Sequence, residues 1–131
     1  MDINEANRRG YKHKNLIFWL GIIESMAIPI SPQEQVLDFG CGHGLFLQLL
    51  FEINSYSNGV GIDVDEESIE LAKSYQVERG ENFPIEYYLA NNFSDENYKE
   101  NFDVIFCQEA FWMNNDLSAI AKRFYKLLKP G

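Results

Sequence analysis

The feature that most limits how this chain folds is a short apolar run, residues 35–39, that passes directly into a turn with three alternating glycines, Gly40, Gly42 and Gly44. Glycines let a backbone turn sharply and approach a ligand that a Cβ atom would push away. A second apolar run, residues 45–51, follows at once and predicts a helix whose first amides point back at the turn. A strand, a glycine turn and a helix in this order are typical of the ligand-binding edge of an open α/β sheet.

Strand and helix signals alternate along the rest of the chain. Predicted strands span residues 35–39, 59–64, 85–90 and 103–107, and predicted helices span residues 14–26, 45–51, 65–77 and 117–128. A polar loop, residues 91–101, precedes the fourth strand, which is apolar at consecutive positions and is therefore expected to be buried on both faces. We predict an α/β fold, a doubly wound, Rossmann-like parallel sheet with helices on both faces.

Length and charge narrow the class of protein. The 131 residues, 46% of them hydrophobic, suit one domain, which we divide into an N-terminal helical segment, residues 1–33, and a Rossmann-like core, residues 34–131. A formal net charge of −9 argues against a nucleic-acid partner, because phosphate backbones bind cationic surfaces.

Apolar runs stay far below the roughly 20 residues that cross a bilayer, and the chain opens without a signal peptide, so we expect a cytoplasmic protein without a membrane partner. Two cysteines are too few for a disulfide scaffold or a metal cluster, so we expect no metal.

Asp38 decides between two kinds of ligand for the glycine turn. A nicotinamide fingerprint places its third glycine where this chain has Leu45. Asp38 also stands just ahead of the glycines, where a carboxylate would repel a pyrophosphate but would suit a ligand with an amino group and a sulfonium. The alternative is a purely structural turn in which Asp38 caps local amides.

Asp63 ends the second predicted strand, about twenty residues beyond the glycines, which is where dinucleotide-binding folds place a ribose-binding carboxylate. Such a carboxylate can accept hydrogen bonds from both ribose hydroxyls. Its alternative role is to cap the following helix, but Asp65 is better placed to do so. We therefore predict that Asp63 binds the ribose of a nucleoside-containing cofactor.

Four segments together resemble successive motifs of the class I S-adenosylmethionine-dependent methyltransferases: EQVLDFGCGHG, VGIDVDEESIELAK, FDVIFCQEAF and LKPG, which occur in this order within residues 34–131. The resemblance implies S-adenosylmethionine as the cofactor. The residues that it implies for cofactor binding are Asp38, Gly40, Cys41, Gly42 and Gly44 around the methionine part, and Asp63 at the ribose with Val64 next to it.

Family members place an acidic residue and its neighbour against the adenine after the third strand. In this chain those positions correspond to Asn91 and Asn92, with Phe93 beside them. An asparagine amide can still hydrogen-bond the adenine edge, although the charge that is usual in the family is missing. The resemblance adds Gln108, just after the fourth strand, to the cofactor-binding residues.

The stretch that begins at Gln108 would face the transferred methyl group and its acceptor. It resembles small-amine N-methyltransferases of the sarcosine and dimethylglycine type, which often carry a histidine where this chain has Met113. Glu109 is the candidate catalytic residue, to orient or deprotonate an acceptor; a solvated loop residue is the equal alternative. The resemblance implies an enzyme that methylates a small molecule, or else a non-catalytic or partner-completed module that binds S-adenosylmethionine.

The relatives continue beyond the LKPG motif with further strands. Without them, family strand order leaves the fourth strand at an open edge, which can pair with another chain. The sequence therefore predicts a fold that stops after the fourth strand and its helix, and self-association through that edge.

Overall fold

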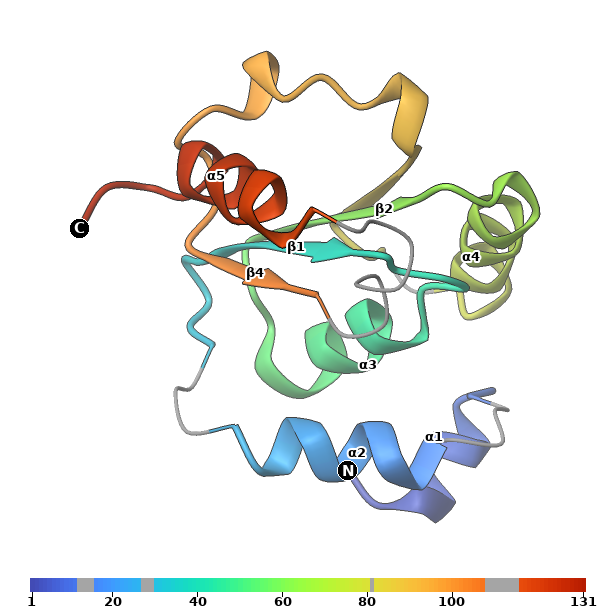
Figure 1. Cartoon of the computed structure of the whole chain (residues 1–131). Helices are drawn as coiled ribbons and strands as arrows, with labels where there is room; N and C mark the ends of the chain where they lie inside the picture. The colour runs from blue at the N-terminus through green and yellow to red at the C-terminus, as the bar shows by residue number, and fades with distance from the viewer. Residues whose placement is uncertain (12–15, 27–29, 81, 108–115) are drawn as a thin grey trace.

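The computed structural model describes residues 1–11, 16–26, 30–80, 82–107 and 116–131 (Figure 1). Its elements, in chain order, are α1 (Ile3–Arg8), α2 (Leu16–Glu24), β1 (Gln35–Phe39), α3 (Leu45–Asn54), β2 (Asn58–Asp63), α4 (Glu66–Glu78), β3 (Ile85–Leu89), the 3-10 turns η1 (Ala90–Asn92) and η2 (Glu96–Tyr98), β4 (Val104–Phe106) and α5 (Leu117–Leu127). The alternation of strands and helices in the core is the one that the sequence predicts.

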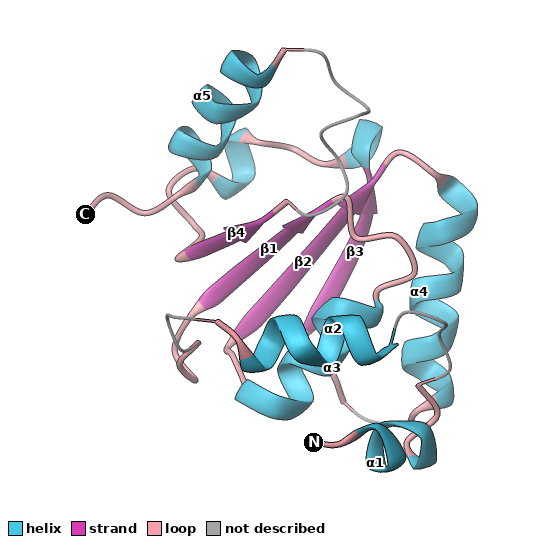
Figure 2. Cartoon of the chain, turned by 60° about the horizontal axis from the view of Figure 1, so that its bottom comes forward, coloured by secondary structure: helices cyan, strands magenta, loops and turns pink. Residues whose placement is uncertain are grey.

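The four strands form one parallel sheet in the order β3-β2-β1-β4 (Figure 2). Leu37 of β1 pairs with Val60 of β2 on one side and with Ile105 of β4 on the other, so β1 is central. The chain winds outward from β1 through β2 to β3 and then returns to the far side of β1. The two directions of winding diverge between β1 and β4, and such a switch point is where open α/β sheets bind ligands.

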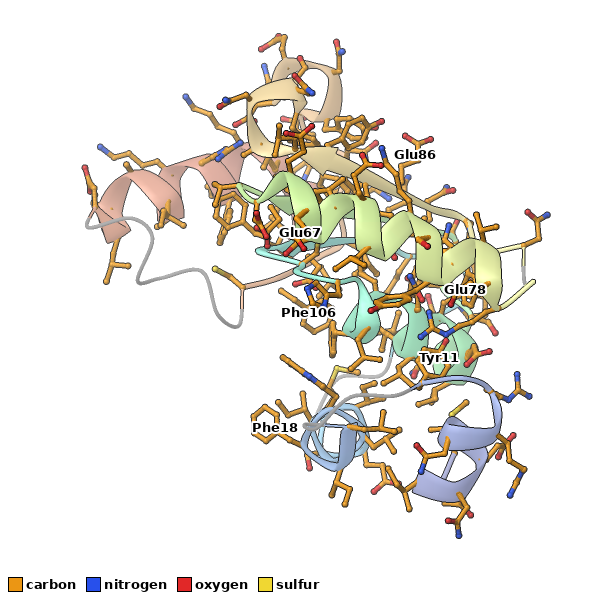
Figure 3. The ribbon with its side chains drawn as sticks, turned by 90° about the vertical axis from the view of Figure 1, so that its right-hand side faces the viewer. Tyr11, Phe18, Glu67, Glu78, Glu86 and Phe106 are labelled. Atoms are coloured by element: carbon orange, nitrogen blue, oxygen red, sulfur yellow. The ribbon has the colours of Figure 1, made fainter. Side chains whose placement is uncertain are left out.

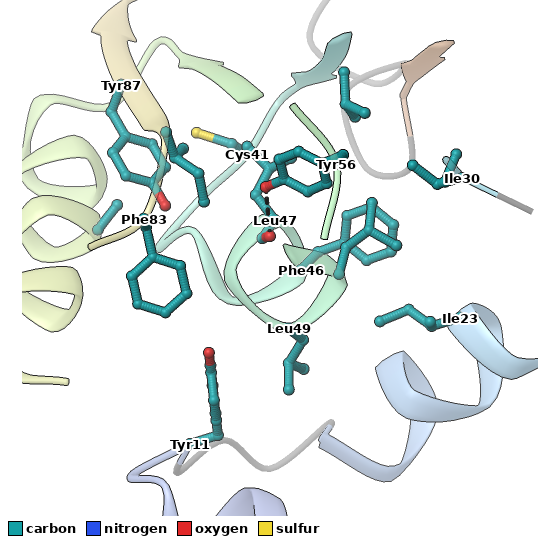
Figure 4. Packing of buried hydrophobic residues seen from close by; sticks show 14 of the residues in the cluster. Tyr11, Ile23, Ile30, Cys41, Phe46, Leu47, Leu49, Tyr56, Phe83 and Tyr87 are labelled. Carbon is teal, nitrogen blue, oxygen red and sulfur yellow. Dashed lines mark hydrogen bonds between the residues drawn. The ribbon is translucent and has the colours of Figure 1, made fainter. Parts of the chain in front are cut away.

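Helices cover both faces of the sheet, as predicted. Figure 1 shows α5 on one face and α3 on the other, with α2 and α1 outside α3. Side chains alternate along a strand, so Val36 joins the core between the sheet, α3 and α4, while Leu37 joins the core beneath α5. Figure 4 shows part of the first core, in which Tyr11 points from the N-terminal segment toward Phe83.

The fourth strand is less buried than the sequence analysis predicts. All three residues of β4 are only half-buried. Both faces of the strand do contact the helix layers, because Val104 packs on the first core and Ile105 on the second. The strand remains partly exposed because it lies at the edge of the sheet.

The N-terminal segment contains one more helix than the sequence analysis predicts. The predicted helix at residues 14–26 corresponds to α2, but α1 precedes it. Asp2 caps α1 by accepting a hydrogen bond from the backbone amide of Glu5 at 2.8 Å, and Ala6 is buried in the core. An acidic residue followed three positions later by Glu is a recognised start signal for a helix.

The predicted loop at residues 91–101 is held by aromatic rings. Its two 3-10 turns bring Phe93 and Tyr98 into a stack with ring centroids 4.9 Å apart, and Tyr98 stacks in turn on Phe102 at 5.6 Å. The loop is therefore anchored to the core beneath α5 and returns the chain to the start of β4.

Candidate functional site

The carboxyl ends of β1 and β2 are joined by one carboxylate. Asp63 accepts a hydrogen bond from the amide of Gly42 at 2.9 Å through one oxygen and from the amide of Asp65 at 3.0 Å through the other. Asp65 is the N-cap of α4, as predicted, and its own carboxylate accepts from the amide of Ser68. Asp63 is therefore not the helix cap, and it holds the glycine turn against the end of β2.

The glycines of the turn serve different purposes. All three have φ angles in the left-handed region, at 88° for Gly40, 54° for Gly42 and 79° for Gly44. A Cβ atom on Gly42 would meet nothing within 4 Å, so this glycine borders open space. A Cβ atom on Gly44 would lie 2.7 Å from the hydroxyl of Tyr87 and 3.0 Å from the Cβ of Ala72. The sequence analysis assigns all three to ligand approach, whereas the structure requires Gly44 for internal packing.

The first turn of α3 faces the same edge of the sheet. Gly44 is the N-cap, and because glycine has no side chain it makes no side-chain cap hydrogen bond to the first amides of the helix. The first amides of a helix have no partner within the helix and carry the positive end of its dipole. Since α3 spans ten residues, its start can favour a carboxylate or another anion placed beside the turn.

Two carboxylates give the turn a negative surrounding. Asp38 is buried, with 4% of its surface exposed, at the end of β1. Burial, followed by the charges of Asp38 and Asp63, raises the pKa of the Cys41 thiol. Cys41 is therefore a neutral packing residue beside two carboxylates.

The remaining predicted cofactor residues differ in exposure. Val64, next to Asp63, exposes 61% of its surface. Asn91 and Asn92 are also exposed, in the 3-10 turn that follows β3. The ring of Phe93 is instead buried in the core beneath α5. A contact between Phe93 and adenine stays a prediction, and the structure gives its ring a packing role.

The segment that the sequence analysis predicts to face the methyl acceptor is described only up to Cys107. Gln108 and Glu109 lie outside the described residues. Within the described ranges, no three His, Cys, Asp or Glu side chains gather into a group that could hold a metal ion. None of the helices in those ranges is both long enough and apolar enough to cross a bilayer.

Comparison with known proteins identifies the family. Residues 30–131 match a family described as a methyltransferase domain. The chain belongs to this family, the class I S-adenosylmethionine-dependent methyltransferases. It is 33% identical over 112 residues to a ubiquinone biosynthesis O-methyltransferase of Idiomarina loihiensis, covering 86% of this chain and 44% of that protein. It is 31% identical over 107 residues to phosphoethanolamine N-methyltransferase 3 of Arabidopsis thaliana, covering 79% of this chain and 21% of that one.

Solved structures share the fold of this methyltransferase domain. YcgJ of Bacillus subtilis superposes with a TM-score of 0.67 at 26% identity, covering 86% of this chain and 47% of that one. Phosphoethanolamine N-methyltransferase 2 of Haemonchus contortus, in complex with phosphomonomethylethanolamine and S-adenosylhomocysteine, reaches 0.73 at 19% identity and covers 88% of this chain and 26% of that one. This methyltransferase domain thus spans less than half of each of these relatives. S-adenosylmethionine is the cofactor of the family, and its members include enzymes that act on small molecules.

Proposed function

We propose that this methyltransferase domain binds S-adenosylmethionine across the carboxyl ends of β1 and β2 and transfers its methyl group to a small-molecule acceptor. The observation that carries the proposal is the position of the Asp63 carboxylate, which lies between the glycine turn and the start of α4. Two ribose hydroxyls can bind a carboxylate at this position in place of, or beside, the backbone amides.

The nucleoside half of the cofactor fits the residues around Asp63. The exposed side chain of Val64 offers an apolar surface for a purine ring. We propose that the side-chain amides of Asn91 and Asn92, which follow the end of β3, hydrogen-bond its edge. Both contacts are predictions. Because β2 and β3 are parallel neighbours, the residues that follow β3 lie at the same end of the sheet as Asp63.

The methionine half fits the glycine turn. Open space borders Gly42, so a ligand can approach the backbone there. The uncapped start of α3 suits the carboxylate of the ligand. The nearby carboxylates of Asp38 and Asp63 suit its ammonium and sulfonium groups.

The chain contributes to the reaction mainly by alignment. The cofactor supplies an electrophilic methyl group, and an acceptor held in line at about 3 to 3.5 Å needs little further help. We propose that the acceptor binds beyond the carboxyl end of β4. Gln108 and Glu109 follow that strand in the sequence. We propose that Glu109 orients or deprotonates the acceptor. The relatives are named as O- and N-methyltransferases, so we infer that the acceptor atom is oxygen or nitrogen.

The proposal is tested by calorimetric titration with S-adenosylmethionine, S-adenosylhomocysteine and NADH. We expect the first two to bind and NADH not to bind. The substitution Asp63→Asn removes the charge that accepts the ribose hydroxyls, so we expect affinity for S-adenosylhomocysteine to fall by at least about tenfold. Asp65→Asn is the matched control, because the same change two residues away preserves a good N-cap and should leave affinity unchanged.

Two outcomes would count against the proposal. If the folded protein binds neither S-adenosylmethionine nor S-adenosylhomocysteine, cofactor binding by this chain is refuted. If both bind but no methyl group reaches any of a panel of small hydroxyl and amine acceptors, the chain is a non-catalytic binding module and the transfer step is refuted. Equal loss of affinity in Asp63→Asn and Asp65→Asn would reject the specific role of Asp63.

A further inference from the structure

Gln48 lies one helical turn after Gly44 and has no exposed surface. Its side-chain nitrogen donates to the hydroxyl of Tyr87 at 2.8 Å and to the backbone carbonyl of Ala72 at 3.2 Å. A buried amide with both donors engaged has a fixed orientation, because rotating it would leave these groups without partners. Gln48 therefore ties α3 to α4 and to β3 directly behind the glycine turn.

Arg79 fixes the other end of the Gln48 amide. It caps the carboxyl end of α4, and one of its guanidinium nitrogens donates to the side-chain oxygen of Gln48. The same guanidinium lies 3.8 Å from the ring centroid of Tyr11, which is a close cation–π contact. Tyr11 is fully buried, and Figure 3 shows it below the end of α4, near Glu78.

These four side chains, three of them buried and Arg79 half-buried, form a continuous series that we call the buried polar chain. Its members, from the N-terminal segment to the sheet, are Tyr11, Arg79, Gln48 and Tyr87. The series starts next to α1 and ends behind the last glycine of the turn.

Tyr87, the last member of the buried polar chain, packs directly against the glycine turn. The Tyr87 hydroxyl occupies the space that a Cβ atom on Gly44 would need, at 2.7 Å from that position. The Tyr87 ring also lies 2.8 Å from the position of a Cβ atom on Gly61, so two glycines accommodate it. The backbone of Gly44 therefore packs against Tyr87, and Gln48 holds the hydroxyl of Tyr87 in place.

We propose that the buried polar chain positions the glycine turn for the cofactor, so that docking of the N-terminal segment and binding of S-adenosylmethionine stabilise each other. Tyr87 acts as the positioning residue for Gly44, and Tyr11 connects the N-terminal segment to it. This inference rests on the proposed function, because it concerns the conformation of the same binding turn.

The physical basis of the coupling is that each member of the series depends on the next. If the N-terminal segment left the core, Arg79 would lose the ring of Tyr11 beneath its guanidinium. The half-buried guanidinium of Arg79 would then lose the cation–π contact that helps to hold it on the amide of Gln48. Coupling between two sites is reciprocal, so a ligand that fixes the turn must also favour the docked segment.

Tyr56 provides a matched control for Tyr87. Its hydroxyl is also buried, donates to the backbone carbonyl of Leu47 at 2.7 Å and lies against a glycine, Gly59. It sits just before the start of β2, at the end of the sheet away from the glycine turn, and none of the hydrogen bonds described joins it to the buried polar chain. Figure 4 shows both tyrosines and, as a dashed line, the hydrogen bond from Tyr56 to Leu47 of α3.

The first experiment compares Tyr87→Phe with Tyr56→Phe by calorimetry with S-adenosylhomocysteine and by thermal unfolding. Both variants lose one buried hydrogen bond, so we expect similar falls in melting temperature. We expect affinity to fall about fivefold in Tyr87→Phe and to stay within about twofold of wild type in Tyr56→Phe. Equal affinities in the two variants would overturn the positioning role of Tyr87.

The second experiment follows backbone amide exchange. In the ligand-free protein, Tyr87→Phe should speed exchange across residues 40–46, whereas Tyr56→Phe should not. This comparison needs no ligand, so it judges the positioning role even if the wild-type protein fails to bind S-adenosylhomocysteine and the proposed function falls. Unchanged exchange in Tyr87→Phe would overturn the inference.

The third experiment tests the link to the N-terminal segment. S-adenosylhomocysteine should slow amide exchange in α1 of the wild-type protein, and Tyr11→Leu should weaken its binding by about fivefold. If Tyr11→Leu does not fold, Arg79→Lys replaces it, because lysine keeps the charge but loses the flat guanidinium that stacks on the ring. If the amide exchange rates in α1 are the same with and without bound S-adenosylhomocysteine, the coupling is refuted.

Discussion

Cys41 lies in the middle of the glycine turn, yet its thiol is buried and donates a long hydrogen bond to the carbonyl of Gly42, at 3.7 Å. Burial and the neighbouring carboxylates raise its pKa, and the thiolate is the form that reacts. We therefore expect iodoacetamide to leave Cys41 unmodified in the folded protein and to modify it in urea, as read by peptide mass spectrometry. Cys107 is half-buried and serves as the internal reference that should react first. Equal labelling of both cysteines in the native protein would contradict this expectation.

Asp103 joins the start of β1 to the end of the chain. Its carboxylate accepts the amide of Gln35 at 2.7 Å and the ammonium of Lys129 at 3.1 Å. Although burial acts in the opposite direction, these two partners lower the pKa of Asp103. A carboxylate whose pKa is lowered by folding stabilises the folded state above its unfolded pKa, near 3.9, and loses that contribution as the pH falls through the lower folded value.

The substitution Asp103→Asn should therefore reduce stability at neutral pH by about 1 kcal/mol and make little difference at acid pH. The Lys129 partner is 40% exposed, so solvent screens that pair and most of the effect should come from the Gln35 amide. Urea unfolding of both proteins at neutral and acid pH measures the difference. Lys129→Met is the control and should cost less than Asp103→Asn. A difference that persists unchanged into acid would show that the charge of Asp103 is not responsible.

At the scale of the elements, the glycine turn contains two positions that alanine should affect differently. In Gly44→Ala the new Cβ atom meets Tyr87 and Ala72 at a positive φ, so we expect a loss of about 3 kcal/mol from overpacking and backbone strain. In Gly42→Ala the Cβ atom enters open space, so only the strain of about 1 kcal/mol remains. Urea denaturation compares the two variants. Equal losses would mean that backbone conformation, and not contact with Tyr87, determines the need for glycine at position 44.

Most core elements are predictable from the sequence because their apolar patterns are long and end at clear signals. Asp65 is recognisable as a helix cap, and that recognition leaves Asp63 for another role. The short helix α1 is missed because six residues give too little periodicity, although the spacing of Asp2 and Glu5 marks its start.

The roles of individual site residues are predictable only where the neighbours are close in sequence. Gly44 and Phe93 are both assigned to the ligand from their places in motifs. Their packing partners, Tyr87 for the glycine and Phe102 within the shared core, come from other elements and become visible only after folding. Gln48 is missed for the same reason, since one glutamine within an apolar helix gives no indication of three partners.

At the scale of the whole molecule, the sheet has two different edges. At the β3 edge, α4 packs beside the strand through Ile69 and Ala72. At the β4 edge, the chain after α5 begins to run alongside, because Leu128 forms an isolated parallel bridge with Phe102 and the amide of Lys129 donates to the Phe102 carbonyl at 2.8 Å. Among the residues described, no strand pairs with the outer side of β4 itself.

That outer edge leads us to predict that the 131-residue chain self-associates in solution. The amide of Phe102 points outward to the carbonyl of Leu127, while the amide of Asp103 points inward to Gln35. Successive amides alternate along a strand, so Val104 should present its N–H outward and Ile105 should present its N–H to β1. A strand from a second copy would satisfy the outward groups, and sedimentation across a range of concentrations measures the association.

Proline substitutions separate this edge pairing from general loss of structure. Val104→Pro removes an outward N–H, which an edge strand tolerates, so we expect a folded protein that sediments as a monomer at every concentration. Ile105→Pro removes an N–H on the β1 side and should instead destabilise the sheet. If the wild-type chain is already a monomer at all concentrations, the edge does not pair with a second copy. If Val104→Pro associates as strongly as wild type, the contact lies elsewhere, since a copy paired along β4 depends on that N–H.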